Sequence, residues 1–288
     1  MKIANKLKRK LIQIAAFGFT NSHIGNFMEG KLYIGKWKQF CNPGLNCYSC
    51  PAASFACPIG AMQAVAGSMN YSFSFYVTGF LLAIGVLLGR FICGWICPFG
   101  LIQEFIHKIP SKKLRLPKPF TYVKYAVLLI FVIILPVAAT NYMGIGKPAF
   151  CQFICPSGTL VGGIPMLSTH KELRDTIGLL FSVKMTILLG TVIGCVFIYR
   201  FFCKTLCPLG AIYGLLNKVS FYHLEVDKLK CVKCGKCVTT CKMDVDPVKN
   251  PNSAECIRCG ACQAVCPTKA ISIGFTSNKI SIRKEIEQ

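Results

Sequence analysis

Four long apolar stretches, separated by polar and positively charged segments, dominate the first 224 residues of this 288-residue chain. A helix needs about 20 mostly apolar residues to cross the ~30 Å hydrocarbon core of a bilayer. The stretches that approach this length are residues 11–27, 71–89, 122–139 and 176–199. The pattern predicts an α-helical integral membrane protein with about four transmembrane helices.

The first stretch is the weakest of the four. Gln13, Asn21, Ser22 and His23 interrupt its apolar pattern, and it follows a basic segment, as the apolar part of a signal peptide does. The sequence contains no small-residue cleavage site after it. We therefore expect an uncleaved first helix.

The positive charges of the connecting segments predict an orientation. Residues 1–10 carry five Lys or Arg and residues 90–120 carry six, whereas the segments between the other spans are poorer in them. Cytoplasmic loops of membrane proteins are enriched in Lys and Arg. We expect a multi-pass protein of the cell membrane, with both termini in the cytoplasm.

Composition supports a membrane protein over a soluble one. Hydrophobic residues make up 53% of the chain and charged residues 15%, against about 25% charged residues in a typical soluble domain. The net charge is +22, from 33 Lys and Arg against 11 acids. A chain this basic could bind nucleic acid, but its charges follow the predicted topology, so we expect an anionic lipid surface and no nucleic acid as partner.

The segment from residue 225 to 288 is polar and rich in cysteine, and we interpret it as a second domain, a small α+β ferredoxin-like domain. It contains two C-x2-C-x2-C-x3-C runs, the spacing that binds two [4Fe–4S] clusters, with the fourth cysteine of each run on the other cluster. The expected ligand sets are Cys231, Cys234, Cys237 and Cys266 for the first cluster and Cys256, Cys259, Cys262 and Cys241 for the second. Paired zinc sites also use four thiolates, but two interlocked runs make them a poor alternative.

An internal repeat points to a third cluster. Arg90-Phe-Ile-Cys-Gly-Trp-Ile-Cys-Pro-Phe-Gly aligns with Arg200-Phe-Phe-Cys-Lys-Thr-Leu-Cys-Pro-Leu-Gly, at the ends of two predicted spans. The repeat brings four cysteines to one side of the membrane, which are Cys93, Cys97, Cys203 and Cys207. Arg90 and Arg200 could reach the membrane interface and offset cluster charge, or act only as anchors of the topology.

Six further cysteines fall on the other side in this topology, and they are Cys41, Cys47, Cys50, Cys57, Cys151 and Cys155. They suffice for one four-cysteine cluster with two thiols to spare. Cys57 and Cys155 head equivalent C-P-x-G turns, so we expect both to be ligands, whereas the remaining ligands, and a disulfide between the spare pair, stay open. Lys184 lies within the fourth span and could contact a quinone or this outer cluster, or extend its ammonium to the interface.

These motifs resemble those of the NapH/NosR-type membrane polyferredoxins. The paired C-x3-C-P motifs after membrane spans and the C-terminal double-cluster domain carry the resemblance, and the segment Cys41-Asn-Pro-Gly-Leu-Asn-Cys-Tyr-Ser-Cys-Pro looks nearer to the YccM-like 4Fe-4S membrane proteins. The resemblance implies that electrons pass between a quinol or cytoplasmic donor and an extracytoplasmic partner. It also implies ligation at Cys93, Cys97, Cys203, Cys207 and the eight C-terminal cysteines.

The leading hypothesis is a membrane-bound protein that relays single electrons between a cytoplasmic partner and a quinone or an extracytoplasmic acceptor. Its expected cofactors are two [4Fe–4S] clusters in residues 225–288, one or two in residues 1–224, and a quinone if one binds between them. Such a chain is more an electron-transfer subunit of an oxidoreductase than an enzyme on its own. The alternative is a protein of iron–sulfur assembly, metal handling or redox sensing.

Overall fold

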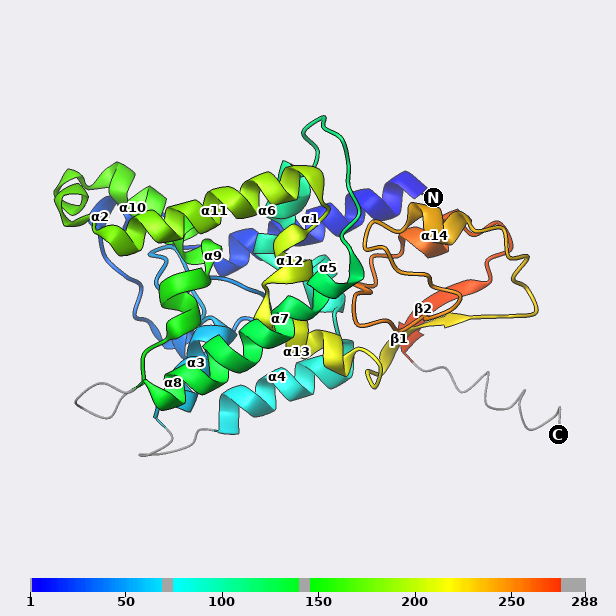
Figure 1. Ribbon diagram of the computed structural model, residues 1–288, viewed down its shortest axis with the longest axis horizontal. Coiled ribbons are helices and arrows are strands. Elements are labelled where there is room, and N and C mark those ends of the chain that lie inside the picture. Colours follow the sequence, from blue (N-terminus) through cyan, green and yellow to red (C-terminus); the bar gives the residue numbers. More distant parts are fainter. Residues whose placement is uncertain (1, 69–74, 140–145, 276–288) are drawn as a thin grey trace.

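The computed structural model describes residues 2–68, 75–139 and 146–275. Figure 1 shows helices filling one end of the molecule and the cysteine-rich segment forming a smaller lobe at the other end, close to the N-terminus. We call the described part of residues 2–221 the body and residues 222–275 the tail. The predicted helical class of the body is confirmed.

The body is built from thirteen α-helices and several shorter helical segments. The α-helices are α1 (Lys2–Thr20), α2 (Asn26–Glu29), α3 (Pro58–Gly67), α4 (Phe75–Leu88), α5 (Phe91–Trp95), α6 (Pro98–Ile106), α7 (Val123–Val127), α8 (Leu135–Ala138), α9 (Pro156–Gly158), α10 (Ile164–Thr169), α11 (Leu179–Phe197), α12 (Phe201–Thr205) and α13 (Pro208–Leu216). The 3-10 segments are Lys36–Gln39, Lys118–Tyr122 and Lys171–Thr176, and the π-helical segments are Leu128–Ile134, Phe150–Ile154 and Thr159–Gly163.

Two helices among the described residues are long and apolar enough to cross a bilayer. Lys118–Ala138, which joins a 3-10 turn, α7, a π-helical segment and α8, corresponds to the third predicted span, and α11 corresponds to the fourth. The helix α4 is apolar but shorter, and residues 71–74 of the second predicted span lie outside the described residues. Two such helices support a membrane protein weakly and leave the four-span arrangement as a prediction.

The first predicted span has the wrong bounds. The helix α1 begins at Lys2, within the basic segment, and ends at Thr20, so residues 21–25 are not helical. Asn21 ends the helix because its side-chain amide binds the carbonyl oxygen of Phe17 at 3.1 Å and the hydroxyl of Thr20 at 3.1 Å. Asparagine side chains compete in this way with helix continuation.

The four C-P-x-G turns share one local structure. Cys57, Cys97, Cys155 and Cys207 each stand in extended conformation directly before a helix, and the following proline opens α3, α6, α9 or α13. Proline fits the first helical position because its fixed φ suits the helix and no hydrogen bond is lost. Each turn therefore places a cysteine at a helix N-terminus.

The tail contains a two-stranded antiparallel sheet and two short helices. Strand β1 (Tyr222–Val226) pairs with β2 (Ile271–Phe275) in the register Tyr222–Phe275. The helices α14 (Lys236–Thr240) and α15 (Ala261–Val265) follow Gly235 and Gly260, whose φ angles are 71° and 75°. Such angles suit glycine, which has no Cβ. Because both glycines sit after the second cysteine of a run, the two runs fold alike.

One core connects the parts of the body and reaches the tail. It contains Cys57 and Cys155 of the outer predicted set together with Cys93, Cys97 and Cys207 of the repeat. Met243, Val245 and Ile257 of the tail belong to the same core, and Cys241 and Cys259 pack against it. Three of the four predicted cysteine groups therefore have members in or against one continuous packed interior, whereas Cys237 of the first tail group lies in a separate small core.

Candidate metal centres

The two cysteine runs of the tail enclose two separate cavities. One cavity of about 30 Å³ is lined by Cys231, Cys234, Cys237 and Cys266, and a second of about 30 Å³ is lined by Cys241, Cys256, Cys259 and Cys262. Each cavity takes three cysteines from one run and the fourth from the other. This is the exchange that the spacing predicts for two [4Fe–4S] clusters.

A larger cavity lies in the body among the outer cysteines. It has a volume of about 270 Å³ and is lined by four cysteines, which are Cys47, Cys57, Cys151 and Cys155. Cys41 and Cys50 do not line it, and the Sγ of Cys50 instead donates to the carbonyl oxygen of Val161 at 3.4 Å. We call these four cysteines the outer group. The structure thus places four of the six outer cysteines around one cavity.

Lys184 of α11 also lines the outer cavity. Burial raises the pKa of the Cys47 thiol, while the Lys184 ammonium acts in the opposite direction by favouring the thiolate. This position agrees with a contact between Lys184 and the outer group, which is one of the roles considered for Lys184. A cation there would offset negative charge on a cluster.

The four cysteines of the repeat, which we call the inner group, are buried together. Cys93, Cys97, Cys203 and Cys207 are between 4 and 6% exposed. Burial, together with the neighbouring Cys203 and Cys93, raises the pKa of the Cys97 thiol to about 12. Thiols that affect one another in this way stand close together in an environment of low polarity.

Arg90 and Arg200 bind across the repeat. The Nη2 of Arg90 donates to the carbonyl oxygen of Cys203 at 3.0 Å, and the Nη1 of Arg200 donates to the carbonyl oxygen of Cys93. Both side chains are fully buried, so the expectation that they reach the membrane interface is wrong. Each arginine instead fixes the backbone of the other half at its first cysteine.

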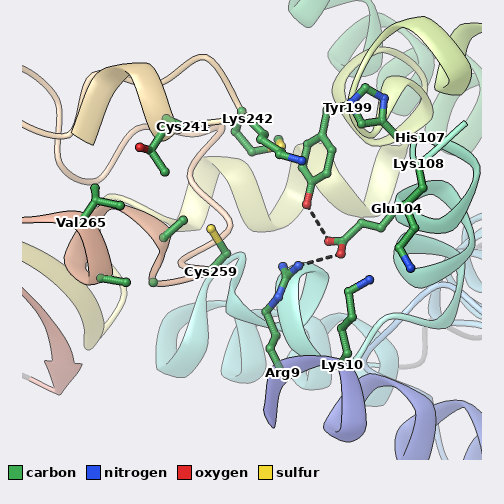
Figure 2. Close-up of a pocket in the computed structure, with 15 residues that line it drawn as sticks. Arg9, Lys10, Glu104, His107, Lys108, Tyr199, Cys241, Lys242, Cys259 and Val265 are labelled. Carbon is green, nitrogen blue, oxygen red and sulfur yellow. Dashed lines mark hydrogen bonds and ion pairs between the residues drawn. The ribbon is translucent and has the colours of Figure 1, made fainter. Parts of the chain in front are cut away.

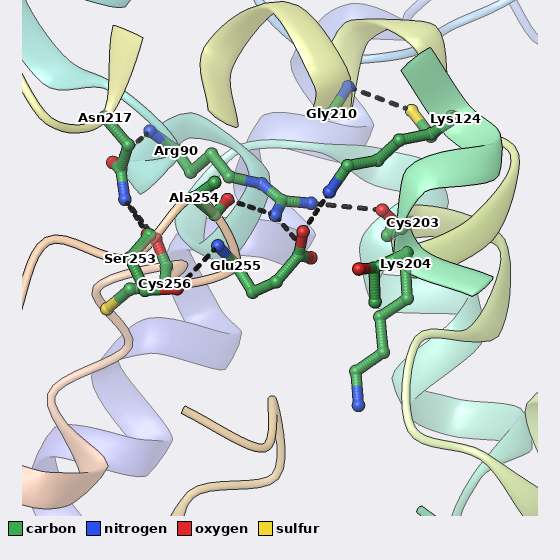
Figure 3. Close-up of polar contacts among 12 residues, drawn as sticks. Arg90, Lys124, Cys203, Lys204, Gly210, Asn217, Ser253, Ala254, Glu255 and Cys256 are labelled. Atoms are coloured by element: carbon green, nitrogen blue, oxygen red, sulfur yellow. Dashed lines mark hydrogen bonds and ion pairs between the residues drawn. The ribbon is translucent and has the colours of Figure 1, made fainter. Parts of the chain in front are cut away.

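Carboxylates that lie far away in the sequence neutralise these arginines. Glu255 of the tail accepts from Arg90 at 2.8 Å and also from Lys124, as Figure 3 shows. Glu104 of α6 accepts from the Nη2 of Arg200 at 2.6 Å. Burial alone would raise the pKa of Glu255, but Arg90 and Lys124 outweigh it and hold this pKa below its usual range. These charge pairs explain why two guanidinium groups can be buried.

Comparison with known protein families agrees with the cysteine groups. Residues 54–75, 69–117, 125–171 and 183–223, which cover more than half of the chain, match a family described as a 4Fe-4S binding domain. The chain belongs to this 4Fe-4S binding domain family. A second family with the same description matches residues 250–272 in the tail.

Several relatives of this 4Fe-4S binding domain protein carry names from electron transport. It is 28% identical over 202 residues to the putative electron transport protein YccM of Escherichia coli, covering 62% of this chain and 52% of that protein. It is 24% identical over 168 residues to the ferredoxin-type protein NapH of Haemophilus influenzae, covering 44% of this chain and 55% of that protein. An uncharacterized protein of Methanocaldococcus jannaschii is 30% identical over 175 residues, covering 57% and 63%.

The resemblance to NapH/NosR-type and YccM-like proteins is thereby confirmed. The matches cover only about half to two thirds of the length of these relatives. No solved structure matches the chain.

The donor groups of this 4Fe-4S binding domain protein fit four-iron clusters better than single metal ions. Among the described residues, no group of three or more His, Cys, Asp or Glu side chains is arranged to hold one metal ion. A [4Fe–4S] cluster binds each of its four thiolates through a different iron, so its ligands surround a cavity. The outer group and both tail groups have this form, and all nineteen cysteines are free thiols, so no disulfide joins Cys41 and Cys50.

Two buried glutamines that the sequence analysis missed contact these groups. Gln63 donates to the Sγ of Cys151, and Gln103 donates to the Sγ of Cys203. A signal was present, because each glutamine follows a C-P-x-G cysteine by six positions. Cys195, in contrast, is a fully buried cysteine of α11 that belongs to none of the four groups, although its Sγ lies 3.6 Å from the amide oxygen of Gln103.

Proposed function

We propose that this protein is a membrane-bound iron–sulfur protein that relays single electrons between a cytoplasmic partner and a quinone or an extracytoplasmic partner. The observation that carries the proposal is the continuous core, in which the outer and inner cysteines and two tail cysteines pack together. Electron tunnelling slows steeply with distance, so a relay needs centres that follow one another closely. Bound clusters would supply the one-electron chemistry, while the chain sets their spacing and surroundings.

Four clusters are assigned in this proposal, one to each cysteine group. The tail holds two clusters, through Cys231, Cys234, Cys237 and Cys266 and through Cys241, Cys256, Cys259 and Cys262. The inner group of Cys93, Cys97, Cys203 and Cys207 holds the third, and the outer group of Cys47, Cys57, Cys151 and Cys155 holds the fourth. The cavities, the burial of the thiols and the family matches support this assignment.

A loop of the body supports a direct link between the outer and inner groups. The carbonyl oxygen of Pro43 accepts from the hydroxyl of Tyr213 at 3.0 Å, and a Cβ placed on Gly44 would lie 2.9 Å from the Cα of Cys97. Three residues further along the loop, Cys47 lines the outer cavity. One short segment thus contacts both groups, which favours electron exchange between them.

The outward faces of the long helices support a membrane location. Only 17% of the most apolar part of α11 is buried, and Leu189 and Ile193 on this helix are 55% and 58% exposed. Exposed apolar surface on this scale is rare in monomeric soluble proteins and is stable in contact with lipid. We propose four spans, the first formed by the apolar part of α1, which ends at Thr20, and the others near residues 71–89, 122–139 and 176–199, with the tail in the cytoplasm.

A cationic pocket at the junction of tail and body is the proposed contact site for the cytoplasmic partner. It has a volume of about 330 Å³ and lies between α1, α6 and the second tail cluster group, with Cys241 and Cys259 in its wall (Figure 2). Lys10, Lys108 and Lys242 line it, and none of them forms an ion pair among the described residues. Burial and the neighbouring Lys108 lower the pKa of Lys10, so an anionic partner would relieve unfavourable charge there.

The alternative of a redox-sensing or metal-handling protein has less support. A protein that senses oxidants or transfers metal ions through spare thiols needs those thiols to be accessible. The two outer cysteines that do not line the cavity, Cys41 and Cys50, are 6% and 0% exposed. These thiols are therefore poorly placed to react with oxidants or to pass on metal ions.

Electron transfer across sealed vesicles tests the proposed function. Purified protein is reconstituted anaerobically into liposomes that contain ferricyanide, and dithionite is added outside. We expect the protein to accelerate reduction of the trapped ferricyanide, Cys207→Ala to return the rate to that of empty liposomes, and Cys50→Ala, which lies outside the four groups, to leave the rate unchanged. Fully loaded wild-type protein with the rate of empty liposomes would contradict the relay. In a parallel detergent sample, reduction of the clusters by added quinol tests quinone as the partner.

The cationic pocket has its own test. Lys108→Gln should slow reduction of the tail clusters by an acidic ferredoxin at low salt, and raising the ionic strength should remove the difference, because charge attraction mainly speeds encounter. Lys112→Gln, in the same basic segment but outside the pocket, is the matched control. Equal effects of the two substitutions would argue against this contact site.

A further inference from the structure

Gln63 and Gln103 occupy equivalent places in the body. Each follows the cysteine of a C-P-x-G turn by six positions, on α3 and α6 respectively. Both side chains are buried, with 0% and 1% of their surface exposed. A buried amide in an apolar helix costs free energy unless its hydrogen bonds are satisfied, so the partners of these two amides need an explanation.

The two amides make the same pair of donor contacts. The Nε2 of Gln63 donates to the Sγ of Cys151 at 3.1 Å and to the carbonyl oxygen of Ile59 at 3.2 Å. The Nε2 of Gln103 donates to the Sγ of Cys203 at 3.0 Å and to the carbonyl oxygen of Phe99 at 3.4 Å. In both cases the oxygen acceptor lies four residues earlier on the same helix.

Backbone donors fix which end of each amide faces the sulfur. The Oε1 of Gln63 accepts from the backbone N–H of Phe150 at 2.9 Å, and the Oε1 of Gln103 accepts from that of Cys203 at 3.4 Å. A backbone N–H can only donate, so the oxygen of each amide must face it. The N–H groups therefore point to the thiols.

The two receiving cysteines are equivalent as well. Cys151 and Cys203 each stand four positions before the cysteine of a C-P-x-G turn, Cys155 and Cys207. Cys151 belongs to the outer group and Cys203 to the inner group. The body thus repeats one arrangement, in which a glutamine after the Cys-Pro of one segment contacts the first cysteine of a C-x3-C-P motif in another.

We infer that Gln63 and Gln103 are matched positioning residues that raise the reduction potentials of the outer and inner clusters, respectively, through these N–H···S contacts. A reduced cluster carries one more negative charge than an oxidised one. A hydrogen bond to a ligating sulfur therefore stabilises the reduced form more strongly and makes reduction easier. The inference rests on the proposed function, because it requires clusters in both groups.

The two potentials can be adjusted separately in this arrangement. Each glutamine contacts a thiol of only one group among the described residues. Glutamines with a purely structural role would hold the helices together without affecting either potential. The reduction potential is thus the property that separates the two roles.

Redox titrations followed by low-temperature paramagnetic resonance test the inference. The variants are Gln63→Leu and Gln103→Leu, which remove the donor, with Gln152→Leu as the control. Gln152 lines the outer cavity but makes no hydrogen bond to a thiol among the described residues. We expect Gln63→Leu to lower only the outer potential and Gln103→Leu only the inner one, each by about tenfold in the reduction equilibrium, or about 59 mV for one electron.

A second substitution separates the lost hydrogen bond from altered packing. Gln103→Glu keeps the shape of the side chain but replaces the donor with an acceptor, so it should lower the inner potential at least as much as Gln103→Leu. Unchanged potentials in loaded variants would overturn the inference, as would equal shifts in Gln152→Leu. Loss of the inner cluster from both Gln103 variants would also overturn it, because the glutamine would then serve assembly.

The failure of the inference is distinguishable from failure of the proposed function. Iron and acid-labile sulfide are measured on the same wild-type sample before titration. A sample with clusters only in the tail contradicts the proposed function itself. If all clusters are present but neither glutamine substitution changes a reduction potential, only the inference is contradicted.

Discussion

The guanidinium group of Arg90 lies against the carbonyl oxygen of Cys203, with 3.0 Å between Nη2 and oxygen, although the two residues belong to opposite halves of the internal repeat. Arg200 makes the equivalent contact with Cys93. The two halves are thus joined by a crossed pair of arginines directly behind the inner group. Any movement of one half would displace a cysteine of the other.

Removing either arginine should destabilise the body and empty the inner group. Arg90→Gln removes the donor to the carbonyl of Cys203 and leaves Lys124 as the remaining buried cation at Glu255, and loss of one member of a buried ion pair costs about 3–5 kcal/mol. We expect a lower midpoint of denaturation in detergent and a loss of about one cluster of iron.

Arg115→Gln is the matched control for this prediction. Its side chain is 75% exposed and lies 3.6 Å from Asp244, so its removal should cost at most about 1 kcal/mol. Similar midpoints and iron contents for the Arg90 and Arg115 variants would show that the crossed arginines do not support the inner group.

The choice of outer ligands gives a second prediction. Cys47→Ala should remove one cluster, because Cys47 lines the cavity with Cys57, Cys151 and Cys155. Cys41→Ala and Cys50→Ala should retain full iron, because these residues lie outside that cavity. Iron analysis of the three purified variants decides the point, and full iron in Cys47→Ala would mean that another cysteine is the fourth ligand.

The loop between the outer and inner groups should tolerate no side chain at Gly44. An alanine Cβ there would lie 2.9 Å from the Cα of Cys97 and 3.3 Å from the Cδ of Pro98, so the loop must shift. We expect Gly44→Ala to lower thermal stability and inner-cluster occupancy. Gly79→Ala in α4, where a Cβ meets nothing within 4 Å, should leave both unchanged or slightly raise stability. Equal thermal stability and equal cluster occupancy in the two variants would refute the close approach of Gly44 to Cys97.

Glu255 should hold the tail to the body independently of pH in the neutral range. Its pKa is lowered, so its charged contacts contribute fully above about pH 4.3, the value for an unpaired Glu, and are lost only as the pH falls through the lower folded-state pKa. Hydrogen exchange in the tail, corrected for intrinsic rates, should therefore be constant between pH 5 and 7. Glu255→Gln should raise the exchange rate of the tail over this whole pH range, whereas substitution of the exposed Glu29 by Gln should not change that rate.

The sequence predicts those parts of the sites that local spacing determines. Three of four ligands of each tail group lie within seven residues, and the turn after Cys97 or Cys207 opens a helix because proline follows. The partners of Arg90 could not be predicted in this way. A basic residue beside an apolar stretch suggests an interfacial anchor, and nothing near it indicates that Glu255 of the tail will neutralise it within the core.

Long-range contacts also decide the outer group and the ends of the helices. Cys41, Cys47 and Cys50 share an irregular loop, and long-range contacts of this loop with Tyr213, Cys97 and Val161 accompany the placement of Cys47 alone in the cavity wall. The first helix ends early because Asn21 binds back to Phe17, a local effect that the apolar pattern outweighed in the prediction. Gln63 was overlooked because a single amide in an apolar helix shows its chemistry only beside a thiol.

Metal analysis of the whole chain tests the central claim most directly, which is that clusters occupy the body as well as the tail. Protein purified anaerobically should contain about 16 iron and about 16 acid-labile sulfide per chain, from four [4Fe–4S] clusters. Cys93→Ala and Cys155→Ala should each lower both values by about four. About eight iron in the wild type, unaffected by either substitution, would restrict the clusters to the tail and contradict the account.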